Sequence, residues 1–344
     1  MKYRDLGGLY WRLNVLAEFV KQSEEKKASG IDEEIKKIEA YIEKGWDEMA
    51  ALTPDPELAA QEPDDYDAII AKCPAGGGKN YGVAVDAAYR EKLKAAILSR
   101  FAGCVLGAIV EGWRAEDIEN YAAKIGAAYP PEDYWTDTPY PDQVRYIDST
   151  CKDYLRQNMD SVPNDDDIAF VILSMLILER GGKDFTLDDV AEIWKEYVTM
   201  AYTAEDISLK NLKNGIAPEK AAEKGNCYQE WIGADIRCDG YAYAAPGDPR
   251  KAAKLAYTDA YLTHRRNGIY GSMFFAAAIS ASFALGDPFK AIEAALCEIP
   301  EHCRLADDIR WAMAERKNIK DYKDAIRLVD ERFPGMSITH TLNN

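Results

Sequence analysis

Three adjacent carboxylates, Asp165, Asp166 and Asp167, are the residues best suited to chemistry in this chain. Pro163 ends any preceding helix, and Asn164 or Asp165 can cap a new one. The helix dipole favours carboxylates at this position, but three in a row repel one another. A hard divalent cation such as Mg²⁺ or Mn²⁺ would remove the repulsion, because both ions prefer oxygen ligands. The alternative is an acidic, solvated helix start that binds nothing.

A glycine-containing segment upstream ends in a further carboxylate. Gly103 and Gly107 are four residues apart and share one face of a predicted helix, which would permit close packing of another helix. Glu111 lies four residues further along that face, after an apolar stretch. A carboxylate in such a setting needs a partner if it is buried. Glu111 is therefore either a site residue or a polar residue where the helix ends.

A third segment, residues 230–249, combines glycines, prolines and aromatic residues with Arg237. Glycine-rich chain beside an arginine can hold phosphate, although no P-loop or dinucleotide spacing is present. Thr263-His264 closes the next predicted helix, where the dipole also favours a histidine for purely structural reasons. The three histidines of the chain have no zinc-ligand spacing. Each of these signals is weak when it is taken alone.

Helical periodicity dominates the elements that must position these residues. Residues 53–88 are rich in proline and glycine and predict irregular chain with one short helix. We therefore expect an all-α protein with an N-terminal helical extension, residues 1–90, and a compact multi-helix core, residues 91–344. The predicted helices span residues 9–27, 31–52, 64–72, 89–111, 114–128, 165–180, 186–200, 203–213, 217–223, 249–264, 269–285, 287–297, 302–314 and 321–331.

Composition limits the classes of partner. The chain has 344 residues and a net charge of −17, which disfavours non-specific binding to nucleic acid or an anionic membrane. Seven scattered cysteines without a Cys-x-x-Cys pair, and no visible signal peptide, indicate the cytoplasm. The longest apolar run, Ile269–Leu285, has the Ser, Gly and Ala content of a buried helix rather than a membrane span.

In their order along the chain, these motifs resemble the ADP-ribosylglycohydrolase family, the relatives of dinitrogenase reductase-activating glycohydrolase. Residues 103–111 are similar to the family's Gly-Asp-Ala-x-Gly-x-x-x-Glu helix, with Cys104 in place of the aspartate. Residues 165–168 resemble its Thr-Asp-Asp-Thr metal motif, with Asp and Ile replacing the two threonines. Residues 233–247 resemble its glycine-rich substrate loop, and Thr263-His264 matches its Thr-His. The resemblance covers about residues 95–344.

The resemblance implies a function and a set of site residues. It implies metal-dependent hydrolysis of the glycosidic bond of an ADP-ribosylated protein or small molecule, with release of ADP-ribose. Arg237 and His264 would face the diphosphate. The implied metal ligands are Asp165, Asp166 and Asp167, the implied catalytic residues are Glu111, Asp166 and Asp167, and the implied substrate-binding residues are Gly233, Arg237, Gly240 and His264.

One departure from the family changes these expectations. Relatives carry a second acidic motif, Asp-x-Asp-Thr, after a segment like residues 337–344, and this chain has none. We therefore expect one Mg²⁺ or Mn²⁺ ion rather than two, bound weakly, with low activity. A homodimer or a second chain would cover the resulting groove. The alternatives are a catalytically weak or inactive ADP-ribose-binding protein and a structural or interaction protein on the same scaffold.

Overall fold

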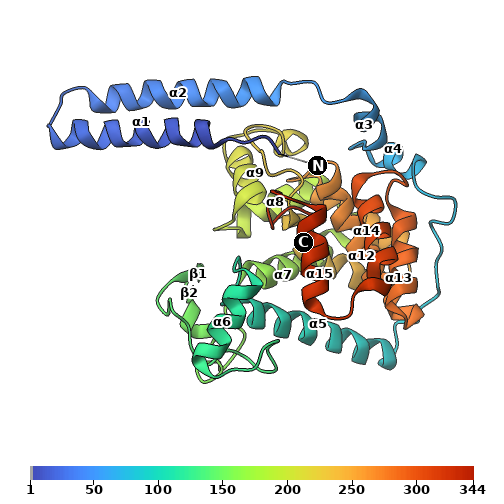
Figure 1. Cartoon of the computed structure of the whole chain (residues 1–344). Helices are drawn as coiled ribbons and strands as arrows, with labels where there is room; N and C mark the ends of the chain where they lie inside the picture. Colours follow the sequence, from blue (N-terminus) through green and yellow to red (C-terminus); the bar gives the residue numbers. More distant parts are fainter. Residues whose placement is uncertain (1–2) are drawn as a thin grey trace. The chain divides into compact units, whose positions relative to one another are not determined.

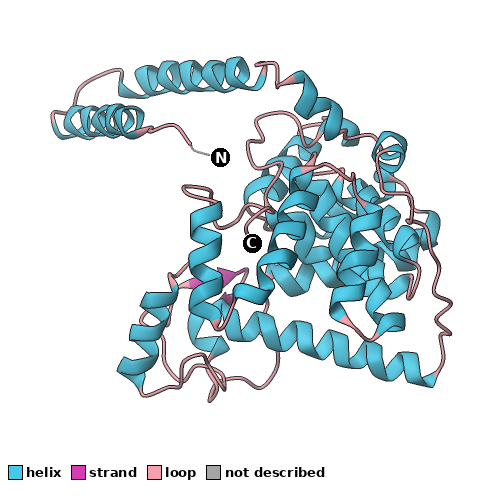
Figure 2. Cartoon of the chain, turned by 45° about the vertical axis from the view of Figure 1, so that its right-hand side comes forward, coloured by secondary structure: helices cyan, strands magenta, loops and turns pink. Residues whose placement is uncertain are grey.

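A computed structural model describes residues 3–344, and helices make up most of it (Figures 1 and 2). The described residues contain fifteen α-helices and one small antiparallel sheet, β1 (Val144–Tyr146) with β2 (Ser149–Thr150). The expectation of an all-α fold is confirmed. The α-helices are α1 (Gly7–Glu25), α2 (Ile31–Ala50), α3 (Pro56–Gln61), α4 (Tyr66–Ala71), α5 (Ala87–Ala108), α6 (Ala115–Ile125), α7 (Asp166–Gly181), α8 (Leu187–Tyr197), α9 (Thr203–Lys213), α10 (Asp239–Ala244), α11 (Pro249–Ala260), α12 (Asn267–Leu285), α13 (Pro288–Ala295), α14 (Arg304–Glu315) and α15 (Tyr322–Arg332).

Contacts group the chain into two units. The smaller unit holds residues 3–59 and 315–337, and the larger holds residues 60–314 and 338–342. In the smaller unit, α1 and α2 form an antiparallel hairpin (Figure 1). Ile35, Ile38 and Ile42 are half-buried along one face of α2, as their helical spacing predicts, but neither helix has a fully buried residue.

Helix α12 is the centre of the larger unit. It packs against α10, α11, α13 and the 3₁₀ helix η4 (Ile232–Arg237). By length and composition α12 could cross a membrane, but 67% of its most apolar window is buried inside the protein. This burial is what the core helix of a globular protein shows, and it agrees with the interpretation of Ile269–Leu285 as a buried helix.

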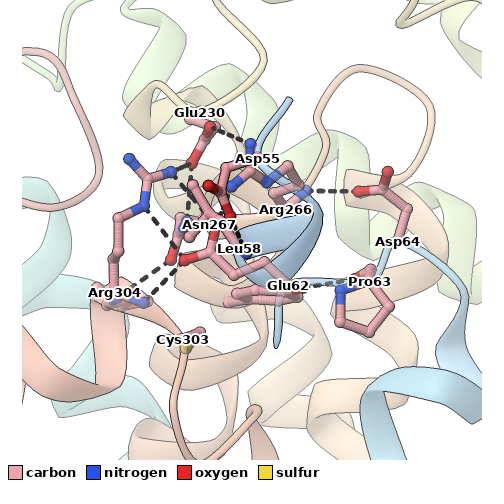
Figure 3. Close-up of polar contacts among 12 residues, drawn as sticks. Asp55, Leu58, Glu62, Pro63, Asp64, Glu230, Arg266, Asn267, Cys303 and Arg304 are labelled. Carbon is pink, nitrogen blue, oxygen red and sulfur yellow. Dashed lines mark hydrogen bonds and ion pairs between the residues drawn. The ribbon is translucent and has the colours of Figure 1, made fainter. Parts of the chain in front are cut away.

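A group of buried ion pairs attaches the irregular connector to the core (Figure 3). Glu62 pairs with Arg266 and with Arg304, whose backbone N–H also donates to the Glu62 carboxylate at 2.9 Å. Glu230 pairs with Arg304 at 2.5 Å, and the Arg266 backbone N–H donates to Asp64 at 2.7 Å. Burial alone would raise the pKa of Glu62, but the hydrogen bonds from Arg304 hold it below its ordinary value. The connector is therefore part of the core from residue 60 onward.

Several elements were not predicted from the sequence, and one predicted helix is shorter than expected. Helix α3 was not predicted, and residues 230–249, expected to be loop, contain η4 and α10. Tertiary packing overrides the glycine content here, since a Cβ at Gly240 in α10 would overlap the Ser174 hydroxyl of α7. The predicted helix at 217–223 is only a 3₁₀ turn, Pro218–Lys220.

Candidate functional site

The acidic triplet lies at the start of α7, as its sequence predicts. Asp165 is the N-cap, and one of its carboxylate oxygens accepts a hydrogen bond from the backbone N–H of Asp167 at 3.2 Å. The side chain is 1% exposed, and the hydroxyl of Tyr154 donates to its other oxygen at 2.7 Å. Core packing therefore fixes the position of the acidic end. The buried apolar residues of the helix are Ile168, Phe170, Val171, Leu173 and Ile177.

A single guanidinium joins Glu111 to this helix start. Helix α5 ends at Ala108, so Glu111 lies in the following turn rather than on the helix, and its side chain is 66% exposed. Arg145, on strand β1, contacts Glu111 with Nη1 at 2.5 Å and Asp165 with Nη2 at 3.5 Å. The structure thus brings Glu111 and the triplet close together, as the motif order predicts.

A second arginine reaches the triplet from α5. The Arg100 Nη2 lies 3.2 Å from a carboxylate oxygen of Asp167 and 3.1 Å from its backbone oxygen. The same nitrogen donates to the backbone oxygen of Ile236 at 2.6 Å. Backbone carbonyls therefore hold Arg100 in place independently of the carboxylate.

These groups line a cleft of about 550 Å³, which is in the size range of small-molecule sites. Nothing lies within 4 Å of a Cβ built on Gly103 or Gly107. The two glycines therefore form an open wall of the cleft and do not serve close helix packing, which corrects that expectation. The lining residues are Ser99, Arg100, Gly103, Cys104, Gly107, Ala108, Glu111, Arg145 and Asp167.

Burial and mutual repulsion perturb the carboxylates. Burial, together with the charges of Asp165 and Asp167, raises the pKa of Asp166 to about 7. Burial likewise raises the pKa of Asp167 to about 6, although Arg100 opposes the shift. Burial and the two neighbouring aspartates also raise the pKa of the Cys104 thiol. Two carboxylates and two arginines line the cleft, and Asp165 and Asp166 beside it add further acidic groups.

The donor set fits one divalent ion. Cys104 Sγ and one carboxylate oxygen each from Asp165 and Asp167 lie within 4.8 Å of one another. Ligands on opposite sides of a Mg²⁺ ion are roughly 4 Å apart, so a modest adjustment closes the set. A thiol ligand suits a softer ion better than Mg²⁺. Within residues 3–344, no other trio of such side chains comes together in this way.

The structure does not bring Arg237 and His264 to this cleft. Arg237 is 1% exposed, pairs with Asp259, and lies 2.7 Å from Glu205. It also donates to the Thr263 hydroxyl at 2.6 Å, and His264 is completely buried with its Nδ1 2.6 Å from that hydroxyl. Because the guanidinium is saturated by protein partners, this geometry favours a structural role over diphosphate binding.

Close packing requires glycine at Gly233 and Gly240, the two glycines predicted to bind substrate. A Cβ at Gly233 would overlap the Glu205 carboxylate, and one at Gly240 would overlap the Ser174 hydroxyl. Neither glycine lines the acidic cleft. Close approach of neighbouring side chains therefore explains both glycines, and their contact with a substrate stays a prediction.

Sequence reasoning missed the two arginines of the cleft. Arg100 precedes Gly103 by three residues and Gly107 by seven, so helical spacing places it on the glycine face. That spacing could have identified it. Arg145 lies on the short strand β1, in a segment for which the sequence predicted no element. The hydroxyl of Tyr202, far away in the chain, donates to the Arg145 carbonyl at 2.6 Å. No local pattern signals such a residue.

The comparisons with known proteins agree with the motif order. Residues 85–343 match the family model described as ADP-ribosylglycohydrolase. No curated protein and no solved structure matches the chain. The match includes the whole acidic cleft and begins two residues before α5.

Proposed function

This chain belongs to the ADP-ribosylglycohydrolase family, and we propose that its acidic cleft hydrolyses the glycosidic bond between ADP-ribose and a protein side chain or small acceptor. Family membership indicates hydrolysis of ADP-ribose linkages in general. The observation that supports this site is the approach of Glu111 and Asp165 to one guanidinium, Arg145, at the edge of a cleft about 550 Å³ in volume.

The exposure of each carboxylate suggests its role in the reaction. Glu111 is the most accessible carboxylate, so it accepts the proton of the attacking water. Asp165 is buried and caps α7, so it holds the acidic start of that helix in place. Asp167 lines the cleft and places negative charge beside the developing oxocarbenium ion, and Asp166 precedes it at the start of α7. A divalent ion bound to Asp165 and Asp167 would orient the ribose hydroxyls and polarise the leaving group.

Because the chain has a net charge of −17, an anionic substrate can bind only where local positive charge attracts it. Arg100 and Arg145 are the arginines that line the cleft, whereas Arg237 and His264 are buried behind protein partners. We therefore assign the electrostatic attraction of the diphosphate to Arg100 and Arg145. The ion itself, Mg²⁺ or Mn²⁺, would add further positive charge.

Release of ADP-ribose from an ADP-ribosylated protein tests this function. The wild-type chain should release ADP-ribose when Mg²⁺ or Mn²⁺ is present and stop when a chelator is added. An Asp167→Asn variant should retain its fold and lose release. Full release in the presence of the chelator, or no release with any ADP-ribosylated protein or small molecule, would contradict the proposal.

A catalytically weak ADP-ribose-binding protein is the second candidate. Cys104 stands where the family has an aspartate, and Arg100 and Arg145 already pair with two carboxylates of the cleft. Both features reduce the negative charge available to hold a metal. ADP-ribose that stabilises the chain against heating, with no release from any conjugate, would favour this candidate.

A further inference from the structure

The two arginines of the acidic cleft are held in different ways. Arg100 donates to the backbone oxygens of Asp167 and Ile236, so its position depends only partly on a carboxylate. The Arg145 guanidinium contacts the side chains of Glu111 and Asp165, and its Cζ lies 5.9 Å from the centre of the Tyr154 ring. Its Nε is buried, and among the described residues it has no hydrogen-bond partner. Among charged groups, the position of the Arg145 guanidinium therefore depends on the two carboxylates that it bridges.

The contacts of Arg145 overlap with those that a metal ion would make. Asp165 belongs to the trio with metal-ligand spacing, and its Oδ2 lies 3.5 Å from the Arg145 Nη2. An oxygen ligand must approach a divalent ion to about 2.1 Å, and two positive charges so close together repel strongly. Binding of an ion therefore weakens the contact between Arg145 and Asp165, and that contact lowers the affinity for the ion.

The anchoring of Arg145 allows its side chain to move without its backbone. The Tyr202 hydroxyl donates to the Arg145 carbonyl at 2.6 Å, and the Tyr146 hydroxyl donates to the Met200 carbonyl at 2.9 Å. These bonds fix strand β1. The partner Glu111, in contrast, is largely exposed and can be solvated when the guanidinium leaves. Rotation of one side chain is therefore enough to open the bridge.

We propose that Arg145 is an exchangeable counter-cation: it neutralises Glu111 and Asp165 while the cleft lacks metal, and it leaves them when a divalent ion binds. This inference rests on the metal dependence that the proposed function includes. It assigns a regulatory position to a residue that no motif of the chain marks. It also implies that metal affinity is set partly by the free energy needed to displace Arg145.

Calorimetric titration of the full chain with Mn²⁺ tests the exchange. Replacing Arg145 with methionine removes the competing charge, and Mn²⁺ affinity should rise by about tenfold, equivalent to roughly 1.4 kcal/mol. Arg145→Lys keeps a positive charge and should bind Mn²⁺ with nearly wild-type affinity. The matched control is Arg156→Met, since Arg156 is exposed and pairs with Asp133 outside the cleft. An Arg145→Met variant that is folded and binds Mn²⁺ no more tightly would overturn the inference.

A second measurement uses the wild-type chain and does not depend on the variant folding. The Nε–Hε resonance of Arg145, in a ¹⁵N-arginine-labelled sample, should shift during titration with diamagnetic Mg²⁺. The Arg156 resonance should stay in place. A stationary Arg145 signal at saturating Mg²⁺ would rule out exchange. The two proposals can fail separately. If Arg145→Met binds Mn²⁺ more tightly but the wild-type chain releases no ADP-ribose, only the hydrolase function is contradicted. If the wild-type chain releases ADP-ribose but Arg145→Met binds Mn²⁺ with unchanged affinity, only the exchange is contradicted.

Discussion

The Tyr154 hydroxyl donates a 2.7 Å hydrogen bond to the carboxylate of Asp165, and both side chains are buried. The same hydroxyl lies 2.6 Å from the backbone oxygen of Asn164. Tyr154 belongs to the 3₁₀ helix η1 (Cys151–Tyr154), so this contact ties the segment after β2 to the first residue of the acidic helix start. It supplies a neutral donor to a carboxylate that has almost no access to water.

Replacing Tyr154 with phenylalanine should therefore destabilise the protein. The ring can remain in place, but Asp165 loses a donor to a buried charge, which costs about 1–3 kcal/mol of unfolding free energy. Urea denaturation followed by circular dichroism measures this loss. Tyr140→Phe is the control, because Tyr140 is exposed and should change stability little. Equal stability of the two variants would show that water or another group replaces the Tyr154 hydroxyl.

Glu111→Gln should separate catalysis from binding. The amide keeps the shape of the side chain but cannot accept a proton, so the rate of ADP-ribose release should fall by about 10²–10⁴-fold. The dissociation constant for ADP-ribose should change far less. Glu116→Gln, an exposed position at the start of α6, should keep the wild-type rate. A normal release rate for Glu111→Gln would assign the base to another residue.

Gly103 should accept a small side chain without loss of stability. A Cβ there has nothing within 4 Å, and alanine favours the helix interior by up to about 1 kcal/mol over glycine. Gly103→Ala should therefore raise the unfolding free energy. Gly103→Leu should fold but weaken ADP-ribose binding, since the larger side chain enters the cleft. Gly240→Ala provides the contrast, because overlap with Ser174 should make it destabilising. A destabilised Gly103→Ala variant would mean that a neighbouring element packs on this face.

Part of this site could be predicted from the sequence, and the part that could not be predicted depends on tertiary packing. The start of α7 could be located because Pro163, the capping aspartate and the following apolar run are local signals. The burial of Arg237 was not predictable, because its partners Glu205 and Asp259 come from α9 and α11, far away in the chain. Local patterns identify helices and caps, whereas the partner of a charge depends on how helices pack.

Glu62→Gln should weaken the attachment of the connector. The amide cannot neutralise Arg266 and Arg304, and removal of one partner from a buried ion pair costs about 3 kcal/mol. Thermal and urea unfolding both measure this loss. Limited proteolysis should also cut the variant faster near residues 60–65. Glu301→Gln, an exposed position, serves as the control. Wild-type stability of Glu62→Gln would show that the two arginines are satisfied by Glu230 or by solvent.

His264 should make stability depend on pH in a predictable direction. Burial lowers the pKa of His264 well below its ordinary value of 6.5, and the charges of Arg237 and Arg265 lower it further. Below pH 6.5 the unfolded chain binds a proton at this residue while the folded chain does not. The contribution of His264 to the unfolding free energy is therefore complete above pH 6.5. It is lost as the pH falls, by up to about 1.4 kcal/mol per pH unit.

A comparison of variants isolates this contribution from the other titrating groups. Glu205 and Asp235 lie near Arg237, and burial raises the pKa of both, so they act in the opposite sense when the pH falls. The wild type and His264→Gln are unfolded with urea at pH 7.5, 6.0 and 5.0, values that bracket the ordinary histidine pKa of about 6.5. The experiment compares the slopes of their unfolding free energies against pH. The variant should be less stable at pH 7.5 but lose less stability on acidification. His302→Gln, at an exposed position, should follow the wild-type slope. If His264→Gln follows it as well, the histidine is protonated in the folded protein, and Glu205, 4.0 Å from its Nε2, is the group that stabilises that charge.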